Sequence, residues 1–515
     1  MMMADIFPWH LADWVLNARD PEALALRCDD KAYNYRQLAN GVRKLAEVLP
    51  PLTVENPVCA LVMKKSIPAV QAVLAVLSRG GCYAPLDASY PPERLQAVLA
   101  VLKPAVLVTD ENNVATLRPP AAALGIPLIN IHDLAEHQNN SHQPINQPLA
   151  AILHTSGSTG LPKSVRIGAA QIEAFSRWVR DTFAPGRDDR LLNHSPLAFD
   201  LTFLDLFSIF RCGATLLLTR EEDAANGPRI GQICRQQRAT LWHSTPTSLR
   251  LLLGADDKAV YPDMRAVLFA GEPMPGAQLE RLRKLFPSAA FYNIYGSSET
   301  NDTFCYPCPQ NLESETVPLG YPLAYTDWRL LDEQLEAVVP EEGGELWVHC
   351  PTLMEGYGDP ALTEQAFRHF EGKRFFRTRD RVRKDAEGVF HFLGRCDDIV
   401  KLNGYRVDLQ DVEQNALRCG WLEECVAFVA ERNGERQLEL AAQGLGEHSA
   451  LALRQHLMQQ LPAYALPRRY HLQSQPLPKN ANGKLSRHAV IKRFGAQEDN
   501  QGRHPVWPEK QGEKQ

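Results

Sequence analysis

The sequence lacks a long apolar run of the kind that crosses a membrane. Its most apolar stretch, residues 67–77, contains Pro68 and Gln71 and is shorter than the roughly 20 residues that a membrane-spanning helix needs. The first residues, MMMADIFPWHLADWV, also lack the charged and apolar regions of a secretory signal. A formal net charge of −6 gives no support to general nucleic-acid binding. We therefore expect a cytoplasmic protein that binds neither nucleic acid nor a membrane.

The number and spacing of the cysteines argue against a disulfide framework and a zinc site. The 11 cysteines are odd in number and scattered over the chain, so they do not make a disulfide framework. One close pair, Cys305 and Cys308, has CxxC spacing, but a zinc site would want a second pair or clustered histidines, and neither is evident. We expect buried thiols. The sequence also contains no internal repeat.

What the sequence does contain is a loop rich in glycine and hydroxyl side chains, LHTSGSTGLPKSV at residues 153–165, which does not match a Walker motif. It follows the apolar run 149–153, which we expect to be a buried strand. Glycine lets backbone N–H groups approach phosphate oxygens, while hydroxyl groups and Lys163 add further donors. The loop is therefore a candidate phosphate cradle, although composition alone also allows a flexible surface linker.

Apolar strands alternate with amphipathic helices along most of the chain. A strand is predicted over residues 58–63 and a helix over 67–79, and similar signals recur as far as residue 294. Shorter β-rich segments follow residue 322, and a βαβ-like pattern begins after GRCDD at residues 394–398. This alternation predicts parallel α/β layers, and a length of 515 residues predicts a second domain.

The loop segment TSGSTGLPK resembles the phosphate-binding signature of the adenylate-forming superfamily, which includes acyl-CoA synthetases, luciferases and the adenylation domains of nonribosomal peptide synthetases. Six further segments occur in the order typical of that superfamily: FDLTFLDLF, YNIYGSSET, GELWVHC with MEGYGDP, FFRTRDR, GRCDDIVKLNGYRVDLQDVE and NANGKLSR. The resemblance covers residues 20–490. It departs from the usual pattern at Ser164 and Arg379, where the family commonly has glycine.

The resemblance implies an α/β fold with a large N-terminal domain and a small, mobile C-terminal domain. Residues 1–394 would form layered α/β subdomains and a β-rich subdomain that bind ATP and an amino acid. Residues 395–492 would form a rotating α+β domain with Asp397 at its hinge, and residues 493–515 a disordered tail. Rotation would withdraw Lys484 after adenylation so that the thioester can form.

The reaction implied by the resemblance joins a carboxylate to AMP. Attack on the α-phosphorus of ATP gives an acyl-adenylate and pyrophosphate, and catalysis consists mostly of holding charges in line and neutralising them. Glu299 matches the ligand of Mg²⁺, which prefers oxygen donors. The expected catalytic residues are Lys484, Lys163, Thr155 and Glu299. The expected ATP-binding residues are Thr155, Ser156, Gly157, Ser158, Thr159, Gly160, Lys163, Asn293, Tyr295, Gly296, Ser298, Asp380, Arg395 and Lys484. Among these, Tyr295 would lie against adenine and Asp380 would bind the ribose hydroxyls.

Asp200 indicates which class of acid is activated. An aspartate in an apolar segment is costly to bury unless it meets a cation, and the resemblance implies that this one binds the α-ammonium group of an amino acid. The alternative is an N-cap for the apolar helix that follows. The other expected pocket residues are Leu201, Leu204, His243, Leu268, Ala270, Ile294, Asp302 and Thr303. Their polar members favour a small polar substrate such as serine or threonine, and their apolar members leave proline as an alternative.

The partner expected from the resemblance is a carrier protein. The chain has too few residues before the first motif for a condensation domain and too few after Lys484 for a carrier domain. We therefore expect a free-standing enzyme of nonribosomal peptide synthesis that loads a separate peptidyl carrier protein on its phosphopantetheine thiol. The alternatives are an acyl- or aryl-CoA ligase and a catalytically degenerate carrier-binding protein, the latter because of Ser164 and Arg379.

Replacement of Lys484 tests the two half-reactions implied by the resemblance. Lys484→Ala should greatly reduce formation of the adenylate, because the lysine would neutralise charge on the carboxylate and on ATP. Transfer to the thiol from preformed adenylate should be spared. The two steps are measured separately by pyrophosphate exchange and by single-turnover loading, and an equal loss in both would contradict the alternation.

Overall fold

The computed structural model describes residues 6–133, 143–155, 162–255, 259–312, 314–396, 398–432, 434–444, 449–479 and 485–495. These residues form two compact units. The larger unit takes its described residues from Met1–Ala88, Leu95–Thr155 and Pro162–Asp397, and the smaller takes most of its residues from Asp398–Gln515. The junction between the units therefore falls within the GRCDD sequence.

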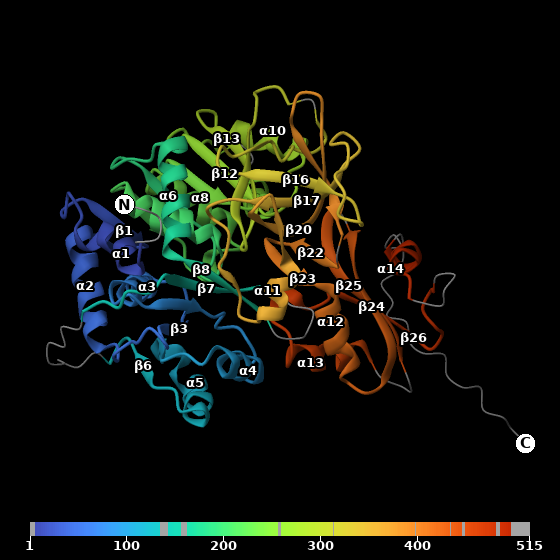
Figure 1. Ribbon diagram of the computed structural model, residues 1–515, viewed down its shortest axis with the longest axis horizontal. Coiled ribbons are helices and arrows are strands. Elements are labelled where there is room, and N and C mark those ends of the chain that lie inside the picture. The colour runs from blue at the N-terminus through green and yellow to red at the C-terminus, as the bar shows by residue number, and fades with distance from the viewer. Residues whose placement is uncertain are drawn as a thin grey trace, which may run out of the picture. The chain divides into compact units, whose positions relative to one another are not determined.

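A sheet of nine strands is the largest element of the larger unit as far as the structure describes it (Figure 1). Its order is β15(Tyr321–Pro322), β14(Asn301–Pro307), β13(Ala290–Ser297), β12(Ala266–Ala270), β11(Leu241–Ser244), β9(Arg190–Asn193), β10(Thr215–Leu218), β1(Leu24–Cys28) and β2(Lys31–Asn34). The six strands from β13 to β1 run parallel, and the strands at both edges are antiparallel. The associated helices are α6(Ala169–Phe183), α8(Gly227–Gln236), α9(Pro246–Ala255) and α10(Gly276–Leu285). The carboxyl ends of the parallel strands consequently meet at one edge of this sheet.

A second sheet of the larger unit has seven strands within the described ranges. Its order is β18(Gly356–Tyr357), β8(Lys163–Gly168), β7(Leu149–Thr155), β4(Cys82–Pro85), β3(Val58–Val62), β5(Val106–Thr109) and β6(Leu128–Asn130). The neighbouring helices are α2(Tyr35–Val48), α3(Ile67–Ser78), α4(Pro92–Leu102) and α5(Glu111–Leu124). The antiparallel strands β7 and β8 form the two sides of the glycine-rich loop, of which residues 156–161 lie outside the described residues.

Helix α3 explains the most apolar run of the sequence. Ten of its twelve residues are buried, and it packs against α1(Pro8–Leu16) and α2 inside a core that includes residues of both large sheets. Its start is fixed by Ser66, whose hydroxyl accepts the Ala69 N–H, and Gly80 follows it at a φ of 72°. None of the helices in the described ranges is both long and apolar enough to cross a membrane.

The β-rich part of the larger unit is a smaller sheet. Its described strands are β16(Asp327–Leu331), β17(Gly344–His349), β20(Lys373–Lys384), β19(Phe367–Phe370) and β21(Phe390–Arg395), with β21 paired to β20. The short helix α11(Pro360–Ala366) precedes β19. The pairing of β20 with β21 brings Asp380 opposite Arg395, so two of the predicted site residues are neighbours across this sheet.

The smaller unit combines a hairpin with a three-stranded sheet in its described part. The hairpin is formed by β22(Ile399–Leu402) and β23(Tyr405–Asp408), and the sheet by β24(Leu422–Arg432), β25(Glu435–Gly444) and β26(Arg469–Gln473). The helices α12(Leu409–Leu417) and α13(Ala450–Met458) share its apolar core, and α14(Arg487–Val490) follows later in the chain. The parallel pairing of β25 with β26, joined through α13, agrees with the βαβ-like pattern of the sequence, although β26 itself was not predicted.

The α/β fold class is confirmed by the layered sheets. One local detail differs: the apolar stretch after Asp200 is interrupted by a π-helix, η2(Phe203–Ser208), before the short α7(Ile209–Arg211). A π-helix shifts side chains relative to an ordinary helix and often marks a functional position. Here it turns Asp205 into the interior, where its exposed fraction is 0%.

Candidate functional site

The carboxyl edge of the nine-stranded sheet gathers most of the residues predicted to bind the amino acid. The register places His243 beside both Asn193 and Leu268, and Ala270 beside Ile294. Neighbouring strands therefore bring together residues that are up to about a hundred positions apart in the sequence. The buried members of this set are Leu204, His243, Leu268, Ala270, Ile294, Asp302 and Thr303, while Asp200 and Leu201 are half-buried.

Asp200 stands immediately before the helical segment that includes the π-helix. The Asp200 carbonyl accepts the Phe203 N–H at 2.9 Å, so its backbone already begins the first turn. A carboxylate at this point is favoured by the partial positive charge of a helix N-terminus. Its half-buried side chain also acts electrostatically on His243 and Asp302. The position fits both readings of the sequence, the α-ammonium ligand and the N-cap.

Two titratable groups of the predicted substrate-binding set have shifted pKa values. Burial raises the pKa of Asp302 to about 7, a rise that His243 opposes and Asp200 reinforces. Burial disfavours the protonated form of His243. The negative charges of Asp205, Asp302 and Asp200 together have the larger effect, so the pKa of the imidazole is raised. Both ring nitrogens of His243 and Asp302 Oδ2 are buried without a hydrogen-bond partner among the described residues. Such atoms are costly unless a ligand satisfies them.

Sequence reasoning missed the residues behind this pocket. Asp205 Oδ1 lies 3.7 Å from His243 Nδ1, and Asp205 Oδ2 accepts Asn193 Nδ2 at 2.5 Å. Lys65, with an exposed fraction of 4%, donates to the carbonyls of three consecutive residues at the end of β9, at 3.2, 2.9 and 3.2 Å. The signal for Asp205 was present, since it is a second aspartate within the apolar stretch FDLTFLDLF. Nothing comparable marked Lys65.

Tyr295, Asp380 and Arg395 meet at the residues predicted to bind the nucleoside. The Tyr295 hydroxyl donates to Asp380 Oδ2 at 2.5 Å, and Arg395 Nη1 donates to Asp380 Oδ1 at 2.5 Å. Burial, with Asp380 beside it, raises the pKa of Tyr295 well above its usual range, so the phenol keeps its proton and stays a donor. Gly296 follows Tyr295, and a Cβ there would lie 1.8 Å from the Asn301 carbonyl oxygen. The backbone therefore approaches too closely for any residue but glycine.

Arg379 occupies the backbone conformation that glycine usually supplies. Its φ is 64°, in the left-handed region, and its carbonyl accepts the Cys396 N–H at 2.7 Å. The turn next to Asp380 is thus kept, although an L-residue pays a conformational cost of about 1–2 kcal/mol there. The departure from the family pattern does not remove the geometry around Asp380.

Glu299 is the candidate magnesium ligand. It has an exposed fraction of 1%, and its Oε1 accepts the Tyr357 hydroxyl at 2.9 Å. Tyr357 belongs to β18, where it pairs with Val165 of β8, so Glu299 is linked to the stem of the glycine-rich loop. A single buried carboxylate fits Mg²⁺, which is commonly held by one or two carboxylates together with phosphate oxygens.

The stem of the glycine-rich loop is held by a polar pair. Thr155 ends β7 opposite Lys163, the first residue of β8, and one step inward His154 lies opposite Ser164. Ser164 Oγ and His154 Nε2 are 3.2 Å apart, and burial lowers the pKa of His154 to about 4. The serine that replaces the usual glycine therefore connects the two strands at the base of the loop.

Several predicted site residues are engaged elsewhere or lie outside the described part of the chain. Asn293 Nδ2 donates to the Pro318 carbonyl at 2.6 Å, and Thr303 Oγ1 donates to the Tyr295 carbonyl at 3.2 Å. Ser298 is half-buried in the turn before Glu299. The residues outside the described ranges are Ser156, Gly157, Ser158, Thr159, Gly160, Asp397 and Lys484.

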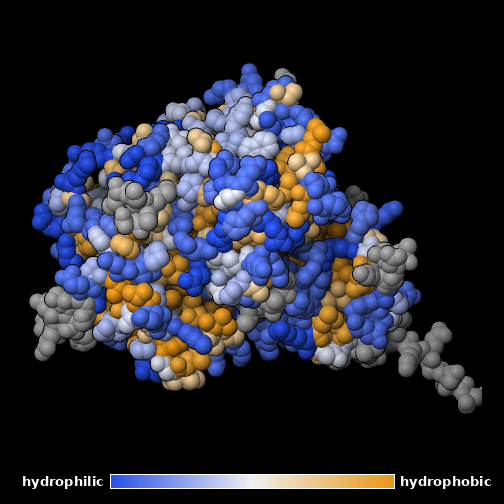
Figure 2. Space-filling view, in the orientation of Figure 1, coloured by the Kyte–Doolittle hydropathy of each residue, from blue (hydrophilic) through white to orange (hydrophobic). Residues whose placement is uncertain are grey.

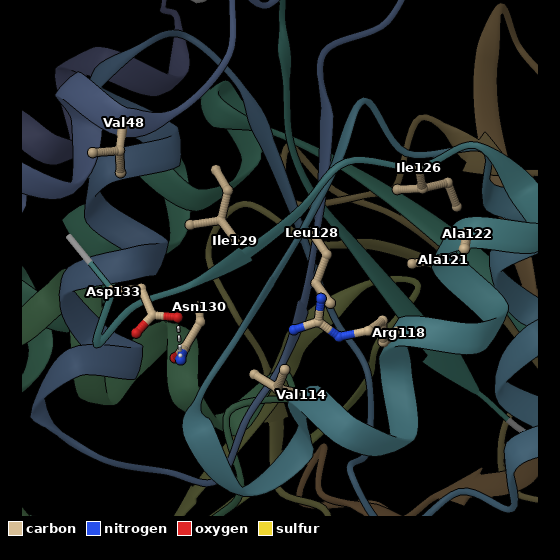
Figure 3. A pocket seen from close by; sticks show the side chains of 10 residues that line it. All are labelled: Val48, Val114, Arg118, Ala121, Ala122, Ile126, Leu128, Ile129, Asn130 and Asp133. Carbon is tan, nitrogen blue, oxygen red and sulfur yellow. Dashed lines mark hydrogen bonds between the residues drawn. The ribbon is translucent and has the colours of Figure 1, made fainter. Parts of the chain in front are cut away.

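A pocket of about 370 Å³ lies on the larger unit between α2, α5 and β6 and contains none of the predicted site residues (Figure 3). Apolar side chains line most of it, with Arg118 on one side and the hydrogen-bonded Asn130 and Asp133 on the other. Figure 2 shows apolar surface gathered in the same part of the larger unit. The chemistry described above is at the sheet edge, so this pocket is not part of it.

Comparison with known proteins identifies similar chains. The family model that matches, described as AMP-binding enzyme, spans residues 13–358. An L-proline--[L-prolyl-carrier protein] ligase of Streptomyces coelicolor is 32% identical over 457 residues, which cover 82% of this chain and 85% of that protein. A D-alanine--D-alanyl carrier protein ligase of Bacillus licheniformis is 27% identical over 490 residues, with coverages of 91% and 95%. A Vibrio cholerae adenylation domain, solved in complex with glycyl-adenosine-5'-phosphate, has a TM-score of 0.81 at 22% identity, with coverages of 95% and 98%.

Replacing Ser164 should weaken the stem of the loop. Ser164→Gly removes the partner of His154 and frees the backbone, so we expect the free energy of unfolding to fall by about 1–2 kcal/mol and the rate of pyrophosphate exchange to change. Ser164→Ala is the matched control, because it removes the hydroxyl but keeps Cβ. Denaturant unfolding that leaves both variants as stable as the parent would show that the serine is a neutral replacement.

Replacing Arg379 by glycine should stabilise the protein. Gly adopts a φ of 64° without a Cβ clash, so Arg379→Gly should raise the free energy of unfolding by about 1 kcal/mol. Arg379→Ala keeps the clash and should give no such gain. Equal stabilities of the two variants in urea would mean that the backbone at this position is not strained.

Proposed function

Because the chain belongs to the AMP-binding enzyme family, we propose that it activates an amino acid with ATP and transfers it to the phosphopantetheine thiol of a carrier protein. The observation that carries the proposal is the cluster of predicted substrate-binding residues at the carboxyl edge of the nine-stranded sheet, where Asp200 is half-buried near the buried Asp302 and several buried apolar side chains. A fatty or aryl acid carries no cationic group that could compensate the negative charge of these carboxylates, whereas an amino acid carries its α-ammonium group. A cytoplasmic location belongs to the same proposal, since ATP is a substrate.

The first half-reaction joins the amino acid to AMP. Asp200 holds the α-ammonium group, and a carboxylate oxygen attacks the α-phosphorus of ATP while the bond to the bridging oxygen of pyrophosphate breaks. Asp380 receives the ribose hydroxyls, Tyr295 lies against the adenine, and Thr155 and Lys163 hold phosphate oxygens with the loop between them. A Mg²⁺ ion held by Glu299 would neutralise phosphate charge.

The second half-reaction forms the thioester. The thiol of the carrier's phosphopantetheine loses its proton to solvent and attacks the acyl carbon of the adenylate. The carbon–oxygen bond to AMP breaks, and AMP leaves with the electron pair. In the proposal the smaller unit rotates about Asp397 between the two steps and removes Lys484 from the adenylation site. Two relatives of similar length are named as carrier-protein ligases, which supports transfer to a carrier rather than to free coenzyme A.

The amino acid is proposed to be small. The names of the relatives give proline and D-alanine for those proteins, and the apolar residues Leu204, Leu268 and Ile294 suit a compact side chain. The buried polar groups of His243 and Asp302 favour a small polar amino acid such as serine or threonine, because proline would leave them unsatisfied. Proline remains the alternative substrate.

The two alternative functions, a coenzyme A ligase and a catalytically degenerate protein, can be distinguished from the proposed one by their activity. An acyl- or aryl-CoA ligase would turn over with free coenzyme A and without a carrier protein. A catalytically degenerate protein would support no exchange with any acid. The contacts of Ser164 and the turn at Arg379 argue against degeneration, because the stem and the nucleoside residues keep their geometry around both departures.

The deciding measurement is ATP–pyrophosphate exchange over all amino acids and several aryl acids. We expect exchange with one small amino acid and its loss, by at least about 100-fold, in Asp200→Ala, because the ammonium group loses its charged partner. Asp189→Asn is a matched control, since Asp189 is buried but pairs with Arg265 at 2.8 Å. Exchange retained in Asp200→Ala would remove Asp200 from the ammonium site and favour its role as an N-cap.

A further inference from the structure

The charged side chains around His243 come from separate elements of the larger unit. Asp205 lies in the π-helix η2, His243 on β11 and Asp302 on β14, while Lys65 directly precedes the turn into α3. Their exposed fractions run from 0% for Asp205 to 8% for Asp302. Water screens such charges poorly, so the state of each depends on the others.

Asp205 is fixed firmly on the side away from the pocket. Its Oδ2 accepts Asn193 Nδ2 at 2.5 Å, and Asn193 is the last residue of β9. Lys65 Nζ holds that strand end through the carbonyls of Asn193, His194 and Ser195, and it also donates to Thr219 Oγ1 at 3.1 Å. Asp205 is therefore attached to a part of the sheet that cannot move without breaking several buried hydrogen bonds.

The other oxygen of Asp205 faces His243. Asp205 Oδ1 lies 3.7 Å from His243 Nδ1, which is an ion-pair distance rather than a hydrogen bond. His243 Nε2 and Asp302 Oδ2 have no hydrogen-bond partner among the described residues. His243 and Asp302 interact electrostatically. A hydroxyl group accepts a hydrogen bond from such a nitrogen and donates one to such an oxygen, so a ligand that places a hydroxyl between the two side chains would satisfy both atoms.

We propose that Asp205 is a positioning residue that acts through His243 and makes the pocket select an amino acid with a side-chain hydroxyl. The inference rests on the proposed function, because the ligand is the amino acid to be activated. With Nδ1 held toward Asp205, His243 donates from Nε2 to the hydroxyl oxygen, and the hydroxyl donates to Asp302 Oδ2. The proline ring offers neither interaction, so both buried atoms would stay unsatisfied.

The same arrangement sets the pH dependence of recognition. His243 faces Asp200, Asp205 and Asp302, and its pKa is raised, so the donor at Nε2 is present below that pKa and is lost as the pH rises through it. Asp302, with a pKa of about 7, must be ionised to accept, so recognition weakens at lower pH as the pair titrates together. Lys65 lies behind Asp205, and burial lowers its pKa to about 7.

The free enzyme offers a test that needs no activity. Histidine labelled with ¹⁵N would report the protonation of His243, assigned by its absence from His243→Gln. We expect the pKa of His243 in the parent protein to lie above 6.5 and to fall by at least about one unit in Asp205→Asn, because the negative charge beside Nδ1 is removed. A parent pKa below 6.5, or an unchanged value in Asp205→Asn, would overturn the role of Asp205.

The selectivity test compares serine with 2-aminobutyrate, which replaces the hydroxyl by a methyl group. In pyrophosphate exchange the parent enzyme should prefer serine by at least about 100-fold in kcat/KM, and Asp205→Asn should reduce that preference to about 10-fold or less with the KM for ATP unchanged. Asp189→Asn is the matched control for loss of a buried carboxylate and should keep the preference. Parent enzyme that prefers 2-aminobutyrate or proline would overturn the inference.

The two tests separate this inference from the proposed function. Exchange with an amino acid other than one bearing a hydroxyl would overturn the inference and leave the proposed function standing. Absence of exchange with every acid would overturn both the proposed function and hydroxyl selection. The histidine titration then decides on its own whether Asp205 controls the charge of His243.

Discussion

Two buried carboxylates and a half-buried third surround one imidazole at the carboxyl edge of the nine-stranded sheet, and compensating their charge is the constraint on which this part of the larger unit depends. Asp205 and Asp302 have exposed fractions of 0% and 8%, and Asp200 is half-buried beside them. Buried charges are tolerated only when they meet opposite charges and hydrogen-bond donors. Asn193 on β9, His243 on β11 and Lys65 before α3 supply these, so the carboxylates are compensated only when those strands are assembled.

The residues predicted to bind the nucleoside depend on a second set of close contacts. Asp380 accepts one hydrogen bond from Tyr295 of the nine-stranded sheet and another from Arg395 of the β-rich sheet. Glu299 and Tyr357 connect the nine-stranded sheet to the stem of the glycine-rich loop in the same way. These bonds join three sheets of the larger unit around the predicted ATP site, which explains why the matching residues are spread over most of the sequence.

The two departures from the family pattern are accommodated by different physical means. Ser164 uses its hydroxyl to connect the strands on either side of the loop, through His154. Arg379 adopts an unfavourable left-handed backbone conformation. The hydrogen bond from the Cys396 N–H to the Arg379 carbonyl helps the surrounding sheet to hold it there. Asp380 accepts hydrogen bonds from Tyr295 and Arg395 with both replacements in place, so a replacement inside a motif need not mean that the motif has lost its chemistry.

The sequence by itself determined the α/β alternation, the bounds of elements such as α3 and β3 to within about two residues, and the superfamily. It also singled out Asp200, His243 and Asp302, because polar residues in apolar segments and matches to known motifs can be recognised without knowledge of the fold. Only the tertiary structure decided that Asp205 and Lys65 stand behind the pocket, that the segment after Asp200 becomes a π-helix, and that Tyr295 meets Asp380 and Arg395. The reason is physical: periodicity reports which face of one element is buried, whereas the partner that compensates a buried charge comes from another element distant in sequence.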